Sequence, residues 1–466
     1  MAKLTFYGAT EGVTGSAYLI ETEKSTILLE CGMVQGKREE EKRNKEPFPF
    51  EIGKLDAVVL SHAHLDHTGR VPKLVADGYS GPVYMTYPTR ELLEILHHDA
   101  ASLQERDAEW ENKRRRRAGK KEIEPLYTTE DVDEALKLYE GFRYDHRENV
   151  AAGIDVCFRE AGHILGSAIV ELFITENGRE RKLVFSGDLG NSHAALLRDP
   201  ETIESADILL MESTYGDRDH RPIDETLAEF EEIISDASKN GGNIIIPSFA
   251  VGRTQEIIFY LGKMYQEGKL KQQAIYLDSP MAIAATEVYH RFQNVFNTED
   301  MASINTSRSH SLHSFLPVLR YSRTTEESML LNKIESGVII IAGSGMCNGG
   351  RVRHHLKHNL WRRNAHVIIV GFQAIGTPGR ALVDGAKTFR VVGEEIAVKA
   401  SIHTLGGFSA HASQSQLVEW ASHFKKPGPK LFLIHGEENA KLALKEKLTE
   451  HGWQPAIPHY GESITF

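Results

Sequence analysis

A cluster of metal-binding side chains directly after an apolar run constrains this chain more than any other feature. Residues 57–69 read Ala-Val-Val-Leu and then Ser-His-Ala-His-Leu-Asp-His-Thr-Gly. An apolar, β-branched run bounded by a polar turn is typical of a buried strand, so the cluster lies at a strand's carboxyl end. His62 and His64 lie two apart in an extended chain and can share one metal ion. Asp66 and His67 follow in the turn and can reach a second ion.

A solvated, histidine-rich turn is the simpler interpretation of this cluster. It is the weaker one, because an H-x-H-x-D-H pattern after a buried strand is far more specific than a lone histidine. Similar side chains also follow other apolar runs, and a set of strand ends that all carry ligand-type residues is hard to explain as packing. These further candidates are His163, Asp188, Glu212 and His435. The remaining histidines, His97 and His98 included, are expected to be ordinary helix or surface residues.

Composition indicates a protein of two or three domains without a membrane span. The chain has 466 residues, of which 41% are hydrophobic and 26% charged, as in ordinary globular proteins. The three cysteines, Cys31, Cys157 and Cys347, are widely spaced and are most simply buried thiols in a reducing compartment. We therefore expect a soluble, cytoplasmic protein that does not bind a membrane, since no apolar run approaches the roughly 18 residues that a span needs.

The charge pattern argues against a general polyanion binder. The formal net charge is -11, whereas nucleic-acid affinity rests largely on the neutralisation of phosphates. Bound cations would offset this charge locally, and its distribution matters more than its sum. One strongly basic run, Lys113 to Arg117 with Lys120 and Lys121 after it, follows a helical segment. A solvated helix end and an RNA contact are both open interpretations of this run.

The second half of the chain predicts a parallel α/β sheet. Apolar strands at 243–247, 274–278, 337–342 and 366–371 alternate with helical patterns. Each of the first three strands ends in a small polar loop that could seat a phosphate, and Arg253 in the first loop is a candidate substrate contact. Residues 296–330 show no clear periodicity and receive no assignment. In the first half, a long helical stretch is expected to run as far as residue 145.

Together these motifs resemble those of the metallo-β-lactamase superfamily. The sequence Glu-Ser-Thr-Tyr-Gly at 212–216 narrows the resemblance to the β-CASP branch, as do Gly-Gly-Phe-Ser-Ala-His-Ala-Ser at 406–413 and Leu-Phe-Leu-Ile-His-Gly-Glu at 431–437. The resemblance implies an α/β protein, an αββα sandwich into which a β-CASP domain, a parallel sheet flanked by helices, is inserted. The expected domains are 1–210 and 398–466 for the sandwich and 211–397 for the insertion.

The resemblance also implies a role for each motif residue. Two Zn²⁺ ions per chain are expected, with Asp188 bridging them. His411 is expected to be a general acid that Glu212 orients, and Glu30 stands where the family usually has an aspartate, so its supporting role is open. The expected ligands of the first ion are His62, His64 and His163, and those of the second are Asp66, His67 and His435.

The implied activity is that of an RNA-processing endonuclease. A hydroxide that bridges the two zinc ions would attack the phosphodiester and leave 5′-phosphate and 3′-hydroxyl ends. The expected partner is RNA, single-stranded because it must enter a groove that the inserted domain covers. The same interpretation is compatible with a homodimer.

Other activities remain as alternatives. A thioesterase of the glyoxalase II kind shares the first motif but lacks the 212–216 and 406–413 motifs. A DNA-processing nuclease of the same branch is closer, although that group lacks a histidine at the position of His435. An inactive scaffold subunit would have lost ligands, and none is lost here. An exonuclease of the ribonuclease J type would add a C-terminal domain, for which we expect no room after His435.

Overall fold

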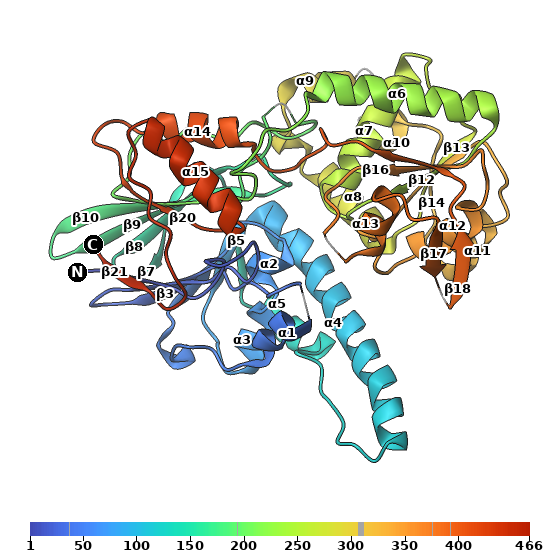
Figure 1. Ribbon diagram of the computed structural model, residues 1–466. Coiled ribbons are helices and arrows are strands. Elements are labelled where there is room, and N and C mark those ends of the chain that lie inside the picture. The colour runs from blue at the N-terminus through green and yellow to red at the C-terminus, as the bar shows by residue number, and fades with distance from the viewer. Residues whose placement is uncertain (37, 193, 306–311, 375, 392) are drawn as a thin grey trace. The chain divides into compact units, whose positions relative to one another are not determined.

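The chain forms two compact units, each of which is described by itself. The computed structural model describes residues 1–36, 38–192, 194–305, 312–374, 376–391 and 393–466. Unit 1 comprises residues 1–192, 199–219 and 411–466, and unit 2 comprises residues 193–198 and 220–410. Figure 1 shows the helices and strands of both units. The expected domain borders, 210/211 and 397/398, lie about ten residues before these divisions and stay predictions of the domain organisation.

Unit 1 contains two mixed sheets. The first has the strand order β21-β1-β2-β3-β4-β5-β6, in which β3 to β6 run parallel to one another. All three residues of β4 are buried, as an apolar strand under helices should be. Its strands are β1 (Lys3–Phe6), β2 (Tyr18–Glu21), β3 (Thr26–Leu29), β4 (Ala57–Val59), β5 (Val83–Thr86), β6 (Tyr139–Phe142) and β21 (Ser463–Thr465).

The second sheet of unit 1 packs on the first. Its strand order is β20-β11-β10-β9-β8-β7, and β11 pairs in parallel with both β10 and β20. One buried core joins side chains of both sheets, such as Phe6 and Val59 with Phe158 and Phe185. The two sheets therefore form the expected sandwich. The strands are β7 (Arg147–Ala151), β8 (Ile154–Glu160), β9 (Ala168–Glu176), β10 (Arg179–Phe185), β11 (Ile208–Met211) and β20 (Lys430–Leu433).

Helices cover the outer faces of this sandwich. On the second sheet, Leu417, Trp420 and Leu444 pack against strand residues such as Val184 and Leu209. The helices of unit 1 are α1 (Arg38–Glu41), α2 (Leu65–Thr68), α3 (Val71–Ala76), α4 (Tyr87–Arg117), α5 (Thr129–Leu136), α14 (Gln414–Ser422) and α15 (Glu438–Glu450), with short 3₁₀ turns at Lys42–Lys45 and Ile52–Lys54.

The expectation of helix as far as residue 145 is wrong. Helix α4 ends at Arg117, and Gly119 then adopts a left-handed φ of 64° that ends the helix. A second helix, α5, starts at a capping box in which Thr128 and Asp131 bond each other's backbone N–H groups. Strand β6 follows as the edge of the first sheet. The charged residues along this segment hid both breaks, since they suit helices and loops equally.

Unit 2 is built on a six-stranded parallel sheet flanked by helices. Its strand order is β14-β13-β15-β12-β16-β19, and a separate hairpin pairs β17 with β18. Ile245, Ile340 and Val367 of the sheet pack against Leu356 and Leu382 of two helices. The strands are β12 (Ile244–Pro247), β13 (Ala274–Leu277), β14 (Leu319–Tyr321), β15 (Val338–Ala342), β16 (His366–Ile369), β17 (Thr388–Val391), β18 (Glu394–Ala397) and β19 (Ser401–Thr404).

The helices of unit 2 fill the segments between these strands. They are α6 (Ile223–Asn240), α7 (Arg253–Gln266), α8 (Pro280–Arg291), α9 (Thr298–Asn305), α10 (Leu312–Phe315), α11 (Thr325–Leu331), α12 (Val352–Asn359) and α13 (Pro378–Val383), with a 3₁₀ turn at Gln293–Val295. The segment 296–330, to which the sequence assigned nothing, holds three short helices and β14, while residues 306–311 lie outside the described part. Among the described residues, no helix combines the length and apolar character that crossing a membrane requires.

A buried ion-pair network occupies the carboxyl end of β13. Asp278 is fully buried and accepts hydrogen bonds from Ser328 and His355, both at 2.6 Å, and from Arg351 at 2.7 Å. Burial alone would raise the pKa of Asp278, but the hydrogen bonds from these groups outweigh it and lower the pKa to about 2. The Asp278 side chain, in one of the loops expected to seat a phosphate, is thus engaged within the protein.

We predict that Asp278→Asn destabilises unit 2 by about 3–5 kcal/mol near pH 7, because it leaves the Arg351 guanidinium and the buried His355 ring without the carboxylate that binds them. A lowered folded-state pKa contributes stability above the unfolded pKa, near 4, and this contribution is lost as the pH falls toward 2. Urea unfolding at several pH values measures both effects. The control, Asp384→Asn, removes an exposed pair with Arg380 and should cost at most about 1 kcal/mol. Equal losses in the two variants would contradict the prediction.

Candidate metal centre

Strand ends of unit 1 deliver the predicted site residues to one place. Strand β4 ends at Val59, and the chain passes through Ser61 to His64 into α2, which carries Asp66 and His67. His163 follows β8, Asp188 follows β10, Glu212 follows β11 and His435 follows β20. Gly32 lets the start of α2 lie against the chain after β3, since an added Cβ would lie 1.7 Å from the Asp66 carbonyl oxygen.

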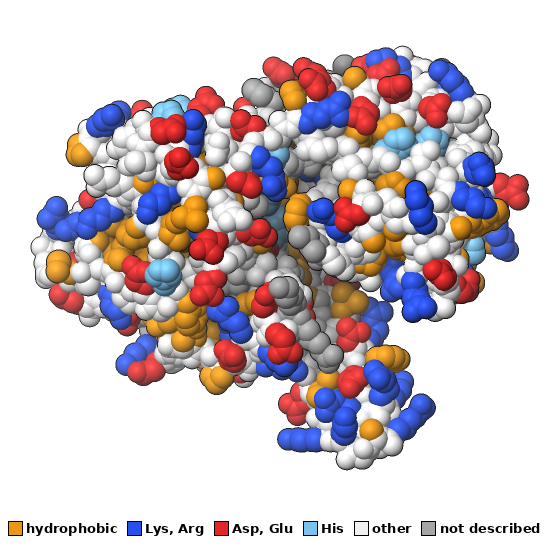
Figure 2. Space-filling model, viewed as in Figure 1, with side chains coloured by type: hydrophobic (Ala, Val, Ile, Leu, Met, Phe, Trp, Pro, Cys, Tyr) orange, Lys and Arg blue, Asp and Glu red, His pale blue; other side chains and the backbone are white. Residues whose placement is uncertain are grey.

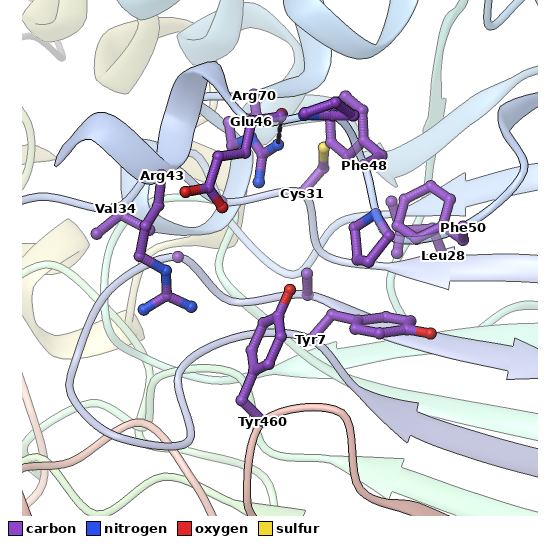
Figure 3. A pocket seen from close by; sticks show the side chains of 15 residues that line it. Tyr7, Leu28, Cys31, Val34, Arg43, Glu46, Phe48, Phe50, Arg70 and Tyr460 are labelled. Atoms are coloured by element: carbon purple, nitrogen blue, oxygen red, sulfur yellow. Dashed lines mark hydrogen bonds between the residues drawn. The ribbon is translucent and has the colours of Figure 1, made fainter. Parts of the chain in front are cut away.

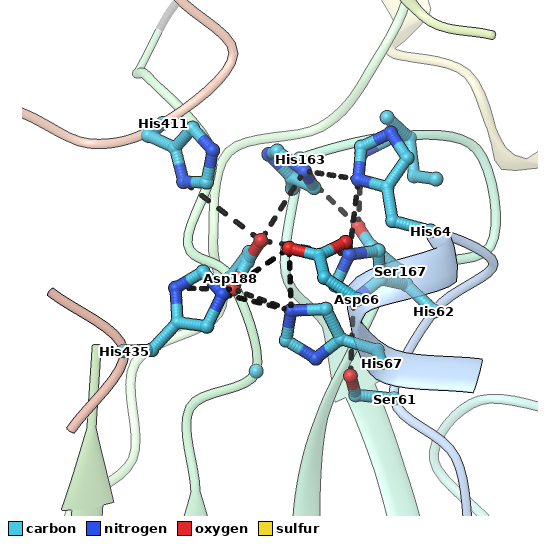
Figure 4. Close-up of polar contacts among 12 residues, drawn as sticks. Ser61, His62, His64, Asp66, His67, His163, Ser167, Asp188, His411 and His435 are labelled. Carbon is cyan, nitrogen blue, oxygen red and sulfur yellow. Dashed lines mark hydrogen bonds and ion pairs between the residues drawn. The ribbon is translucent and has the colours of Figure 1, made fainter. Parts of the chain in front are cut away.

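The donor atoms form two groups, which Figure 4 shows together. In the first, His64 Nδ1 lies 3.1 Å from the Nε2 atoms of both His62 and His163. In the second, His67 Nε2 and His435 Nε2 lie 3.1 Å apart, and Asp66 Oδ2 lies 3.4 Å from the latter. Each group therefore brings the donors of three residues close enough to share one ion.

Asp188 faces both groups with different oxygens. Its Oδ2 lies 3.5 Å from His62 Nε2 and 3.6 Å from His163 Nε2. Its Oδ1 lies 3.3 Å from His67 Nε2 and 3.4 Å from His435 Nδ1. This buried Oδ1 has no hydrogen-bond partner among the described residues. All the separations are close to the roughly 3.3 Å between donors of a tetrahedral zinc ion, so the residues fit two metal ions that share Asp188.

Glu30, whose role the sequence left open, supports the site by binding two residues of the first motif. It is fully buried and accepts hydrogen bonds from the Ser61 amide at 2.6 Å and the Ser61 hydroxyl at 2.9 Å. It also bonds His67 Nδ1, which directs His67 Nε2 toward the other donors. Burial raises the pKa of Glu30, while these partners act in the opposite direction. Its φ of 64° is left-handed, which a non-glycine residue keeps only where the surroundings hold it.

His435 has a support that the sequence did not single out. The Thr214 hydroxyl lies 3.2 Å from His435 Nδ1, so it helps to orient the ring whose Nε2 faces the second group. His435 also adopts a left-handed φ of 49°. Thr214 lies in the Glu-Ser-Thr-Tyr-Gly motif, but only the pairing of β11 with β20 brings it beside His435.

The electrostatics of the site favour cations. Burial disfavours the charged form of every group here, yet the neighbouring imidazoles lower the pKa of Asp188 well below its usual value. Asp66 likewise titrates with a pKa of about 2, because His67 and His435 outweigh its burial. Both carboxylates are therefore ionised at neutral pH. His62 and His64 have lowered pKa values because burial disfavours their protonated forms, which leaves nitrogen lone pairs for a metal.

His411 and Glu212 form a separate pair at the edge of the site. His411 Nδ1 lies 3.4 Å from Glu212 Oε1 and 3.9 Å from Asp188 Oδ2. Burial would lower the pKa of His411, but the Glu212 carboxylate outweighs it and, with Asp188 and Asp66, raises the pKa to about 9. Glu212 is itself held by the Leu189 amide at 2.6 Å. The arrangement suits an imidazolium that can donate a proton.

Arg253 belongs to unit 2 and is engaged there. It is the first residue of α7, is 6% exposed and pairs with Glu256. Its guanidinium also lies 5.6 Å from the ring centre of Phe408. Its assignment as a substrate contact stays a prediction. His97, expected to be an ordinary helix residue, is fully buried and bonds Thr68 and Tyr139 within unit 1.

A separate polar cavity in unit 1 is too small to be the substrate site. Figure 3 shows it between the aromatic rings of Tyr7, Phe48 and Tyr460 and the guanidinium groups of Arg43 and Arg70. Its volume is about 30 Å³, which holds one or two water molecules and no nucleotide.

Comparisons with family models cover most of the chain. The model of the metallo-beta-lactamase superfamily matches residues 10–236, and that of the Beta-Casp domain matches residues 254–382. A third model, described as a Zn-dependent metallo-hydrolase RNA specificity domain, matches residues 395–458. The predicted fold class and the predicted hydrolase class are thereby confirmed, and a metal site is part of that class.

Curated relatives extend over almost the whole chain. Ribonuclease TTHA0252 of Thermus thermophilus is 40% identical, with 98% of each chain covered. The RNase J-like protein of Methanocaldococcus jannaschii is 32% identical over 95% of this chain and 94% of its own. Transcription termination factor FttA of the same organism is 30% identical over 94% of this chain and 68% of its own.

A solved structure supports the same fold. The crystal structure of a protein of unknown function from Enterococcus faecalis V583 superposes with a TM-score of 0.59 at 14% identity, with 99% of both chains covered. This likeness concerns the fold alone, whereas the sequence relatives and the family models identify the lineage. The chain belongs to the β-CASP branch of the metallo-β-lactamase superfamily.

Proposed function

We propose that this protein is a zinc-dependent endoribonuclease that hydrolyses RNA phosphodiester bonds and leaves 5′-phosphate and 3′-hydroxyl ends. The observation that carries the proposal is the placement of Asp188, whose two carboxylate oxygens face separate donor groups. Histidine and carboxylate donors without thiolates suit catalytic zinc with an open position. Two Zn²⁺ ions per chain are proposed, with His62, His64 and His163 on one, Asp66, His67 and His435 on the other, and Asp188 on both.

When bound, two such ions lower the pKa of water and neutralise charge on a phosphodiester. The residues of the chain supply the remaining requirements. Glu30 and Thr214 fix the ring orientations of His67 and His435. His411, kept protonated by Glu212, donates a proton to the departing ribose oxygen. This proton transfer prevents the build-up of negative charge on the leaving group.

The choice of RNA as substrate rests on relatives. Two of them carry the names ribonuclease and RNase J-like protein, and residues 395–458 match a domain described by its RNA specificity. The DNA-processing group of the branch lacks a histidine at the position of His435, so the presence of His435 also favours RNA. We further propose that the RNA is single-stranded. The cytoplasmic location and the homodimer stay predictions.

The first test concerns the metal. Purified protein should contain about two zinc ions per chain, and Asp188→Asn should lower this number toward one or below, because the amide keeps one neutral oxygen and offers an NH₂ group in place of the other. Elemental analysis after dialysis measures the content, and Asp384→Asn in unit 2 is the control. Full activity with one ion or none would rule out the two-metal proposal.

The second test separates proton donor from ligand. His411→Ala should keep its zinc and lose about 10²–10⁴-fold in RNA cleavage, as the removal of a general acid does. His435→Ala should lose zinc as well as activity, and the exposed His423 provides a His→Ala control. If His411→Ala lost zinc while His435→Ala kept it, the two roles would have to be exchanged.

The third test concerns the substrate class. Labelled single-stranded RNA should be cleaved internally, and matched DNA should be cleaved much more slowly. Mapping of the product ends should find 5′-phosphate and 3′-hydroxyl groups, and a chelator should abolish cleavage. DNA cleavage at the rate of RNA would favour the DNA-processing alternative. Hydrolysis of a thioester without any nucleic-acid cleavage would instead favour the thioesterase.

A further inference from the structure

The C-terminal end of α4 and the turn after it form an exposed basic surface, residues 110–121, which we call the α4 tip. In Figure 1 the second half of α4 extends away from the two sheets of unit 1. The last buried residue of the helix is Ala108, and no residue from 109 to 125 is buried. Figure 2 shows Lys and Arg side chains around this end of the helix. Packing against the rest of unit 1 therefore does not explain the residues found here.

The charge of the α4 tip is opposite to that of the chain. Residues 112–121 hold seven cationic side chains and no carboxylate, within a chain of net charge -11. Some of these cations form ion pairs with acidic neighbours, as Lys113 does with Glu109 at 2.8 Å and Arg116 with Glu122 at 3.5 Å. Within the described part of the chain, Arg117, Lys120 and Lys121 form no such ion pair.

The α4 tip has a defined structure. The Asn112 side chain binds the segment that follows the turn. Its amide donates a hydrogen bond to the Ile123 carbonyl and its oxygen accepts one from the Ile123 amide, both at 2.8 Å. Arg115 donates to the Lys121 carbonyl at 2.9 Å. These three hydrogen bonds hold Lys120 and Lys121 beside the last turn of the helix. The cations therefore form one surface instead of a solvated tail.

An exposed tryptophan adjoins these cations. Trp110 is 63% exposed, and the Arg114 guanidinium, one turn away, lies 5.0 Å from the centre of its ring system. Leu103 and Arg117 lie seven residues before and after Trp110, so they share its face of the helix, opposite the buried Ala101 and Ala108. Leu103, which is 47% exposed, therefore joins Trp110 in a small apolar strip beside the cations.

The helix dipole explains only part of the pattern. Cations in a last turn stabilise a helix, but this effect falls off within that turn. It does not account for Lys120 and Lys121, which follow the helix, or for Trp110, which precedes the last turn. An aromatic ring beside several cations is the combination with which proteins bind single-stranded nucleic acid, through base stacking and phosphate neutralisation.

We propose that the α4 tip is a second contact site for single-stranded RNA, with Trp110 stacking on a base and Arg114, Arg117, Lys120 and Lys121 neutralising phosphates. The inference rests on the proposed ribonuclease function, because it treats the bound RNA as substrate. It gives an acidic protein a local surface that attracts a polyanion.

The spacing along α4 sets the length of RNA that can use this contact. His97 lies beside the metal centre, since its Nε2 is 3.2 Å from the hydroxyl of Thr68, the neighbour of His67. From His97 to Arg114 the helix rises about 25 Å, at about 1.5 Å per residue. A stacked strand needs about seven nucleotides to cover this distance. The contact should therefore strengthen the binding of long RNA, whereas a trinucleotide bound at the metal centre is too short to reach it.

The test compares two variants with one control, all in a His411→Ala background, which is expected to retain metal and to cleave slowly. The first variant replaces the four proposed phosphate-binding cations with glutamine, and the second is Trp110→Ala. The control makes the same change of charge elsewhere on unit 1, at four exposed lysines. These are Lys24, Lys54, Lys445 and Lys447. The probes are fluorescein-labelled, unstructured RNAs of about 20 and about 3 nucleotides, and the readout is fluorescence anisotropy at several salt concentrations.

We expect the glutamine variant to bind the long RNA at least tenfold more weakly. The slope of the logarithm of the binding constant against the logarithm of the salt concentration should become shallower by about 0.7 for each phosphate that is no longer neutralised. Trp110→Ala should weaken binding about tenfold, as the removal of one base stack does, with the slope unchanged. Binding of the short RNA should not change in either variant, and the control should resemble the parent.

Long-RNA binding that neither variant weakens would overturn the proposal and leave the α4 tip as a surface for a protein partner or for solvent. Equal weakening in the control would also overturn it, because net charge would then be the cause. Binding is scored without cleavage, so the result is independent of the test of the nuclease itself. If the parent protein binds long RNA through the α4 tip but cleaves none, the proposed enzyme fails while the α4 tip stands as an RNA-binding surface.

Discussion

The placement of one buried carboxylate, that of Asp188, governs the rest of the site. An ionised carboxylate in a protein interior is costly unless positive charge compensates it. Here its two oxygens are approached by imidazoles from both donor groups, and one oxygen has no hydrogen bond among the described residues. The site is therefore stabilised most by cations on both sides of Asp188. Metal binding would then stabilise the folded state, since the preformed cage exists only there.

The scaffold explains how such a cage can be rigid. Its donors come from four strand ends of two packed sheets, those of β4, β8, β10 and β20, and β11 lies between β10 and β20 in parallel. Carboxyl ends of parallel neighbours meet at one sheet edge, so Asp188, Glu212 and His435 are brought together by pairing alone. Glu30 then links the two sides of the first motif by binding both Ser61 and His67. A loop-borne site would lack this support.

Sequence patterns predicted all seven proposed ligands, whose donor atoms the fold brings together, because these residues follow apolar strands and strand periodicity is local information. They could not predict the support of Glu30 or Thr214, whose partners lie 37 and 221 residues away and depend on strand order. The break between α4 and α5 was missed because charged residues mask helix ends. Short helices such as α9 and α11 escaped assignment, since so few residues show no period. The sequence indicated a phosphate-binding loop at Asp278, whereas in the fold the Asp278 carboxylate is paired with Arg351 and His355.

Crystal diffraction at the zinc absorption edge, on protein purified without added metal, would reveal whether Asp188 joins two metal ions. We expect two anomalous peaks about 3.5–4 Å apart, one beside each Asp188 oxygen. The first should lie within about 2.2 Å of the His62, His64 and His163 donors, and the second equally close to those of Asp66, His67 and His435. A single peak, or peaks outside the reach of Asp188, in fully active protein would contradict this expectation.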